Sequence, residues 1–151
     1  MSDYKTKLKN IDSIDTDINI AFVVGEFNLH HTAPLEKSNR EFLEEYGFGN
    51  IDTYWVPGAF EIPGFTAKLL ESDQYDLIIT LGVVIRWDTP HFDYVCGESA
   101  RGIMDLTISY ETPIIFGILT CNTEEQVLSR IGPHFALAGL NLLVEIEKIE
   151  A

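Results

Sequence analysis

Basic residues are scarce in this chain. Its 151 residues include 10 lysines and arginines against 24 aspartates and glutamates, a formal net charge of −14. Nucleic acids and anionic membranes both attract basic surfaces, so we expect neither as a partner. Beyond Lys68 only Arg86, Arg101, Arg130 and Lys148 are basic, so an anionic substrate would have few possible anchors.

Cysteine and long apolar runs are also lacking. Cys96 and Cys121 are the two cysteines, and they have no Cys-x-x-Cys spacing. This pattern indicates buried free thiols rather than a disulfide framework or a zinc site. No apolar run approaches the roughly 20 residues of a membrane span. The polar start, Met1-Ser-Asp-Tyr-Lys, lacks the apolar core of a signal peptide, so we expect a cytoplasmic protein.

Short apolar runs alternate with amphipathic stretches along the chain. The runs at 18–24, 51–56, 76–85 and 113–120 predict strands, and the last two are apolar enough to be covered on both faces. Helices are expected from Thr32 and Pro34 to Tyr46-Gly47, and then at about 60–72, 91–110, 123–131 and 134–149.

This alternation predicts an α/β fold: a three-layer α/β/α sandwich around a central four-stranded, mainly parallel sheet, of the flavodoxin-like type. The length fits a single domain over 1–151, with residues 1–15 as a polar N-terminal arm outside the core.

Ligands of open parallel sheets bind beyond the carboxyl ends of the strands. The four segments there are 25–28, 57–61, 86–91 and 121–124. Two of them, 25–28 and 57–61, carry a phenylalanine beside a polar residue, as a planar ring with a hydroxylated tail would require.

His91 follows Pro90 at the start of a predicted helix. An imidazole there can exchange protons near neutral pH, and a helix N-terminus favours its neutral form. A packing or capping role is the alternative, but the position at a strand end favours function. His30 and His31 lie in a polar stretch that we expect to be exposed, and His134 resembles a helix-start residue, so these three receive no role.

Arg130 ends a predicted helix, where its guanidinium could clamp a phosphate. A helix C-terminal cation stabilised by the helix dipole is an equally good interpretation. Thr89 could add a donor to the same anion, whereas the Asp88 carboxylate would repel it unless it points away or is paired.

Phe27, Phe116 and Glu61 are weaker candidates. The two aromatic residues would ordinarily belong to a core, although Phe27 is flanked by Gly25 and Asn28 and is the better ligand platform. Glu61 could bind polyol hydroxyls or could be a solvated carboxylate at a helix start.

Several segments in register resemble the signature segments of the lumazine synthase family. They are Trp55-Val-Pro-Gly-Ala-Phe-Glu-Ile-Pro63, Gly82-Val-Val-Ile-Arg86 and Thr89-Pro-His-Phe-Asp-Tyr-Val95, and matches at 22–28, 113–120 and 124–130 follow in the same order. The resemblance covers about residues 18–150 and is far more specific than a single glycine motif.

The resemblance implies an enzyme of riboflavin biosynthesis. Lumazine synthases condense 5-amino-6-(D-ribitylamino)uracil with 3,4-dihydroxy-2-butanone 4-phosphate, giving 6,7-dimethyl-8-ribityllumazine, phosphate and water, without a metal or organic cofactor. The family forms homopentamers with active sites between subunits, some of which assemble into icosahedral 60-subunit shells, and riboflavin synthase is a further partner that the resemblance suggests.

The resemblance also implies roles for single residues. His91 matches the proton-transfer residue, and Arg130 matches the phosphate-binding guanidinium beside a loop with Asp88 and Thr89. The positions that match the pyrimidine and ribityl site are Phe27, Ala59, Phe60, Glu61, Val83, Val84, Ile85 and Phe116, the last of which a neighbouring subunit provides.

The sequence departs from the family pattern in the phosphate loop. Trp87 and Asp88 stand where a small Gly-Ala pair is usual, and His134 and Ala138 stand where lysines are expected. An alternative to an active synthase is therefore a catalytically weak paralogue that binds a flavin-like ligand or serves in assembly. A related enzyme with an unphosphorylated carbonyl substrate is a third hypothesis.

Overall fold

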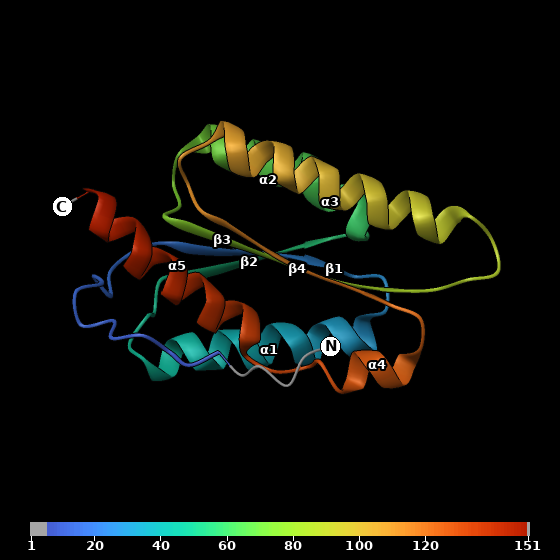
Figure 1. The fold of residues 1–151 in the computed structure, drawn as a ribbon, viewed down its shortest axis with the longest axis horizontal. Coiled ribbons are helices and arrows are strands. Elements are labelled where there is room, and N and C mark those ends of the chain that lie inside the picture. Colours follow the sequence, from blue (N-terminus) through green and yellow to red (C-terminus); the bar gives the residue numbers. More distant parts are fainter. Residues whose placement is uncertain (1–5, 151) are drawn as a thin grey trace.

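A four-stranded parallel sheet forms the centre of the computed structural model, which describes residues 6–150 (Figure 1). Its strands are β1 (Ile20–Gly25), β2 (Ile51–Val56), β3 (Leu77–Ile85) and β4 (Ile114–Cys121), in the order β2-β1-β3-β4. Ile20 pairs with Ile51 on one side and Leu77 on the other, and Ile78 pairs with Ile114. The four predicted strands are confirmed.

Helices cover both faces of this sheet. Figure 1 shows α2 (Ile62–Ser72) and α3 (His91–Ser109) on one face, with α1 (Leu29–Glu45) and α5 (His134–Glu150) on the other. The short α4 (Glu124–Leu128) lies beside the start of α1 in the same layer. The predicted three-layer, flavodoxin-like α/β/α fold is confirmed.

Two apolar layers result from the alternation of side chains along the strands. On β1, Phe22 and Val24 pack with residues of α1 and α5, whereas Ala21 and Val23 pack with residues of α2 and α3. The first eight residues of β3 are all buried, because this strand is central and covered on both faces. That position explains its uninterrupted apolar run.

The first helix begins earlier than the sequence predicted. It starts at Leu29 with Asn28 as the N-cap residue, so Pro34 lies inside the helix and Thr32 is a buried helical residue rather than a cap. Asn28 adopts a left-handed conformation with φ 62°, which asparagine tolerates better than most residues. Its side-chain amide donates a hydrogen bond to the carbonyl of Val83 at 2.9 Å, so a tertiary contact fixes this turn.

Two other helices differ from their predicted ranges. The helix expected at 60–72 begins as a 3-10 turn, η1 (Ala59–Glu61), before α2. The helix expected at 123–131 ends at Leu128, and Arg130 lies in the chain beyond it. The remaining helices agree with the sequence pattern to within about a residue at each end.

The expected polar arm over residues 1–15 packs along α5 in its described part. The Lys9 N–H donates to Asn141 Oδ1 at 2.8 Å, and Ser13 donates to Glu147 at 2.6 Å. Ile14 is buried in the core cluster, and Leu8 packs against it, so this segment is not wholly outside the core as expected. The first five residues lie outside the described part. Within residues 6–150, no helix has the length and apolar character needed to cross a membrane.

Candidate active site

The loops after β1 and β2 are held together at the carboxyl edge of the sheet. The N–H groups of Glu26 and Phe27 donate to the carbonyls of Val56 and Pro57, at 2.7 and 2.9 Å. Since β1 lies between β2 and β3, the chain reverses its direction of travel across the sheet here, which is where ligands of this sheet type bind.

Small residues allow these loops to approach closely. A Cβ atom on Gly25 would lie 3.3 Å from the backbone carbonyl carbon of Gly58 and 3.4 Å from the nitrogen of Ala59. A Cβ on Gly58 would in turn meet a Glu61 carboxylate oxygen and the Cβ of Phe27. The two glycines therefore place Phe27 directly beside the segment 57–61.

A cavity of about 320 Å³ lies at this edge of the sheet, and we call it the β1–β3 cavity. Its lining comes from the loops after β1 and β2, from the end of β3 and from the first turns of α3. The lining residues are Phe27, Pro57, Gly58, Ala59, Phe60, Glu61, Val83, Val84, His91 and Val95. Seven residues singled out from the sequence are thus brought together: Phe27, Ala59, Phe60, Glu61, Val83, Val84 and His91.

The cavity combines exposed rings with a buried apolar floor. Phe27 and Phe60 are each more than half exposed, whereas Ala59, Val83 and Val84 are buried. Glu61 and His91 are exposed at its polar side. This arrangement can sandwich a planar ring, bind hydroxyl groups through a carboxylate and supply one imidazole for proton transfer.

Trp87 is not among the lining residues, but its ring packs against two of them, a contact that was not predicted from the sequence. Its ring centroid lies 5.9 Å from that of Phe27, 5.4 Å from that of His91 and 6.4 Å from that of Phe92. These are the separations of packed aromatic rings. The position of Trp87 directly after Arg86, at the end of a predicted strand, already indicated that it lies near the ligand edge of the sheet. The rings that it contacts depend on the path of the loop and could not be predicted from the sequence.

Arg86 fixes the loop that carries Trp87. Its Nε donates to Asn122 Oδ1 at 2.8 Å, its guanidinium carbon lies 4.5 Å from the centroid of the Phe92 ring, and a longer ion pair of 3.7 Å joins it to Asp93. Arg86 is therefore a tether between the loops after β3 and β4 rather than a free cation.

Ile85, Asp88 and Thr89 line neither this cavity nor the one described next. Ile85 is half-buried at the end of β3, and the other two are exposed in the loop before α3. Asp88 forms no ion pair with a residue of the described part. No cation of the described part therefore neutralises this carboxylate, so it would repel an anion bound nearby unless it points away.

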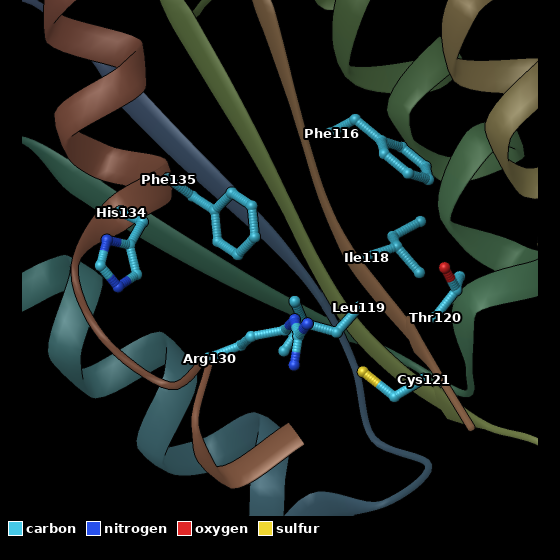
Figure 2. Close-up of a pocket in the computed structure, with 8 residues that line it drawn as sticks. All are labelled: Phe116, Ile118, Leu119, Thr120, Cys121, Arg130, His134 and Phe135. Carbon is cyan, nitrogen blue, oxygen red and sulfur yellow. The ribbon is translucent and has the colours of Figure 1, made fainter. Parts of the chain in front are cut away.

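A second cavity of about 320 Å³ lies between β4 and α5, and we call it the β4 cavity (Figure 2). It contains Phe116 and Arg130, two of the five candidate residues that do not line the first cavity. The other lining residues are Ile118, Leu119, Thr120, Cys121, His134 and Phe135. The two cavities share no residue. Within one chain, Arg130 and His91 therefore lie in different cavities.

Arg130 has donors to spare. Its Nη1 donates to the Gln126 carbonyl at 2.8 Å and to Ser129 Oγ at 3.2 Å, and the guanidinium has no carboxylate partner within residues 6–150. Figure 2 shows the side chain extending from the segment after α4 toward β4. A half-buried guanidinium with unused donors is suited to bind an anion.

The two cysteines are free thiols, as expected. Cys121 is buried and Cys96 is half-buried. Burial raises the pKa of both thiols, and the nearby Arg130 charge opposes part of that rise at Cys121. Both groups therefore remain protonated and weakly nucleophilic near neutral pH.

The expectation that His30 and His31 are both exposed is wrong for His31. Its side chain is only 3% exposed, and its Nε2 lies 2.7 Å from Glu124 Oε1 on α4. His30 is exposed, and its Nε2 lies 3.2 Å from the same oxygen. The two histidines lower the pKa of Glu124 mainly through these hydrogen bonds. The polar sequence of this stretch gave no sign of a partner 93 residues away.

Comparison with known protein families shows that residues 17–142 match the family model described as 6,7-dimethyl-8-ribityllumazine synthase. The matched range includes every segment that lines the two cavities, from the loop after β1 to the start of α5.

Proposed function

The chain belongs to the 6,7-dimethyl-8-ribityllumazine synthase family, transferases of riboflavin biosynthesis, and from this premise we propose that it condenses 5-amino-6-(D-ribitylamino)uracil with 3,4-dihydroxy-2-butanone 4-phosphate. The products are 6,7-dimethyl-8-ribityllumazine, phosphate and water. One observation carries the proposal: Phe27, Glu61 and His91 line the same cavity at the carboxyl edge of the sheet.

The β1–β3 cavity would bind the uracil substrate. The pyrimidine ring stacks on the exposed face of Phe27, and the backbone of Val83 and Val84 supplies hydrogen bonds to its polar edge. Ala59 and Phe60 hold the ring from the side of β2, while the Glu61 carboxylate accepts hydrogen bonds from ribityl hydroxyls. Ile85, at the exposed end of the same strand, extends the backbone contacts.

His91 would move protons during the condensation. The 5-amino group attacks the ketone carbon, and loss of water gives a Schiff base. Removal of the proton from the adjacent carbon, with departure of phosphate from the next one, leaves an enol that becomes a ketone. The ribityl-bearing nitrogen attacks that ketone and a second water is lost, which closes the ring. With both reactants held together, one imidazole at the cavity wall can serve the proton transfers.

The phosphate of the second substrate would be bound by Arg130 together with the loop that carries Asp88 and Thr89. Thr89 offers a hydroxyl donor, and the exposed Asp88 must turn away from the anion. Arg130 holds the leaving group and stabilises its departing charge. Because Arg130 and Phe116 line a separate cavity in one chain, we propose that a neighbouring copy in a homo-oligomer brings its β4 cavity to this site.

A second candidate function follows from Trp87. Its ring packs against both Phe27 and His91, so it occupies space on the two residues that would receive substrate. A protein that binds a flavin-like heterocycle without turning it over, or that serves mainly in assembly, would tolerate this crowding. An active enzyme requires the indole to shift or to stack on the substrate ring.

An assay with both substrates, which follows the lumazine product by absorbance and fluorescence, tests the proposal. We expect the wild-type protein to form product and His91→Ala to lower kcat by about 10²–10⁴-fold. Arg130→Ala should raise the KM for the phosphorylated substrate by about 10–100-fold, the effect of losing charge-assisted hydrogen bonds. Arg101→Ala, which removes an exposed arginine of α3 outside both cavities, is the matched control.

Two results would contradict the enzymatic proposal. Unchanged turnover in a folded His91→Ala variant would remove His91 from the chemistry. Absence of product from a wild-type protein that still binds a ribityl-pyrimidine analogue would favour the second candidate function.

A further inference from the structure

The start of α1 and the start of α4 bring three metal-ligating side chains together outside both cavities. His30 and His31 occupy the second and third positions of α1, and Glu124 is the first residue of α4. One ligand atom from each residue lies within 4.8 Å of the other two. Figure 1 shows that α4 lies beside the beginning of α1, so the tertiary arrangement and not the local sequence creates this cluster.

From this cluster we propose that His30, His31 and Glu124 form a binding site for a divalent transition-metal ion of the zinc type. Two imidazoles and one carboxylate are a donor set that zinc accepts, with water completing the coordination. Imidazole donors also select for such ions over magnesium and calcium, which prefer oxygen ligands.

The distances between the ligand atoms suit this role. Ligand atoms about 2.0–2.1 Å from a tetrahedral zinc ion lie about 3.3 Å from one another. His30 Nε2 already lies 3.2 Å from Glu124 Oε1, and His31 Nε2 lies 2.7 Å from it. All three ligand atoms lie within 4.8 Å of one another, and the exposed Glu124 carboxylate would have to move slightly away from His31 to admit the ion.

The fold fixes the backbone of two of the three ligands before any ion arrives. His31 is 3% exposed, and its backbone N–H donates to the Asn28 carbonyl at 2.8 Å in the turn that starts α1. Glu124 follows Thr123, whose side chain accepts from the Gln126 N–H in a capping box that fixes the start of α4. Such preorganisation reduces the entropy lost when the ion binds.

The remaining coordination side is open to solvent. The side chains of His30 and Glu124 are 65% and 59% exposed, so an ion has direct access and can keep a water ligand. The formal net charge of −14 also raises the local concentration of cations around the protein. An ion bound here would tie α1, which follows Phe27, to α4, which precedes Arg130.

Zinc titration of chelator-treated protein, freed of any polyhistidine tag, tests the site. We expect one zinc ion per chain in a competition assay with a chromophoric chelator, and cobalt(II) bound in its place should show visible absorption bands of a low-symmetry nitrogen and oxygen site. His30→Gln and Glu124→Gln should each weaken zinc binding at least about tenfold. Both positions are exposed, so these variants are expected to fold.

Glu125→Gln is the matched control, because it removes the adjacent exposed carboxylate of α4 without touching the cluster. Zinc should raise the unfolding temperature of the wild-type protein and of this control but not that of Glu124→Gln, since a ligand that binds only the native state stabilises it. Failure of the wild-type protein to bind zinc, or equal binding by all three variants, would overturn the proposal and leave a simple histidine–glutamate hydrogen-bond cluster. None of these measurements depends on lumazine formation.

Discussion

Among single residues, Trp87 changes the character of the β1–β3 cavity most. The indole packs against Phe27, His91 and Phe92 at once, and it is still 36% exposed. A ring in this position can rearrange when a ligand enters, because one face remains open to solvent. Trp87 is therefore a natural reporter of occupancy in this cavity.

We predict that a ribityl-pyrimidine analogue quenches the fluorescence of Trp87. The ligand ring would stack beside the indole and change both its packing and its solvent exposure. Fluorescence titration of the wild-type protein should give a saturable decrease that disappears in Trp87→Phe. Trp55→Phe is the control, since Trp55 lies on β2 and lines neither cavity. Retention of the full signal in Trp87→Phe would show that the ligand binds elsewhere.

Tyr75 is a buried residue just before β3, at the end of the strand opposite the cavity, and its hydroxyl belongs to a hydrogen-bond network. Its hydroxyl donates to Asp52 Oδ2 at 2.7 Å and is hydrogen bonded to Tyr54. Burial raises the pKa of the Tyr75 phenol well above its usual range, and the hydrogen bonds to Tyr54 and Asp52 raise it further. In the unfolded chain the phenol ionises near pH 10. Above that pH the Tyr75 phenolate must therefore take up a proton when the chain folds.

The network predicts a pH-dependent loss of stability. The stabilisation linked to Tyr75 is present below about pH 10 and is lost as the pH rises beyond it. Tyr75→Phe should cost about 1 kcal/mol of unfolding free energy near pH 8, and it should flatten the decline between about pH 9 and 11. Denaturant unfolding of both proteins across this range gives the comparison. Parallel declines would show that another group is responsible.

Candidate residues were predictable where they follow a strand, because the carboxyl edge of a parallel sheet is a fixed location. Phe27, Glu61 and His91 were identified in this way and do line one cavity. The contacts of Trp87 and the burial of His31 were not predictable, since both depend on how a loop or a second helix packs against the residue. The assigned roles of the cavity residues stay predictions.

At the level of elements, the turn between β1 and α1 decides where Phe27 lies. Asn28 supplies two things there: a left-handed backbone conformation and a side-chain amide bonded to the Val83 carbonyl on β3. These two contributions can be separated by substitution. Glycine adopts the conformation but lacks the amide, whereas alanine lacks the amide and is also strained in the left-handed region.

We predict a graded effect for this position. Asn28→Gly should lower the unfolding free energy by about 1 kcal/mol through the lost hydrogen bond. Asn28→Ala should lower it by about 1–2 kcal/mol more, through the left-handed backbone. Both variants should loosen Phe27 and weaken binding of the pyrimidine analogue. Chemical denaturation measures the first effect, and equal losses for both variants would show that the backbone conformation is unimportant.

The strands were the easiest elements to predict, because each is a short run rich in β-branched or aromatic residues between amphipathic stretches, and the central β3 is apolar almost throughout. The start of α1 was predicted wrongly because Thr32 and Pro34 together imitate a helix start. Local sequence favours a cap at Thr32, but the tertiary bond from Asn28 to Val83 fixes the turn four residues earlier. A contact between segments 55 residues apart cannot be inferred from a local pattern.

For the whole molecule, the separation of the two cavities is the main functional constraint. Six basic residues form ion pairs with carboxylates: Lys9, Lys37, Arg40, Arg86, Arg101 and Lys148. Arg130 forms none within the described part and lines a cavity that does not contain His91. A half-buried guanidinium that a strongly acidic protein leaves without a carboxylate partner is suited to bind an anion. That site can serve His91 if a second copy contributes it.

This arrangement predicts complementation between two impaired variants, assayed at a concentration of the phosphorylated substrate well below the raised KM of Arg130→Ala. His91→Ala retains the β4 cavity, and Arg130→Ala retains the β1–β3 cavity. Random 1:1 co-assembly in a head-to-tail ring would pair an intact cavity of each kind at about one quarter of the junctions. Co-expressed or co-refolded mixtures should therefore recover about one quarter of the wild-type activity.

A mixture of His91→Ala with His91→Gln is the control, because it contains no intact junction and should stay inactive. Light scattering on each sample checks that the variants assemble. If both variants form the same oligomer as the wild-type protein and the mixture recovers nothing, then His91 and Arg130 act within one chain or not on the same substrate. Activity above that of this control and of the Arg130→Ala variant alone can arise only from sites shared between subunits, because neither chain alone carries both side chains.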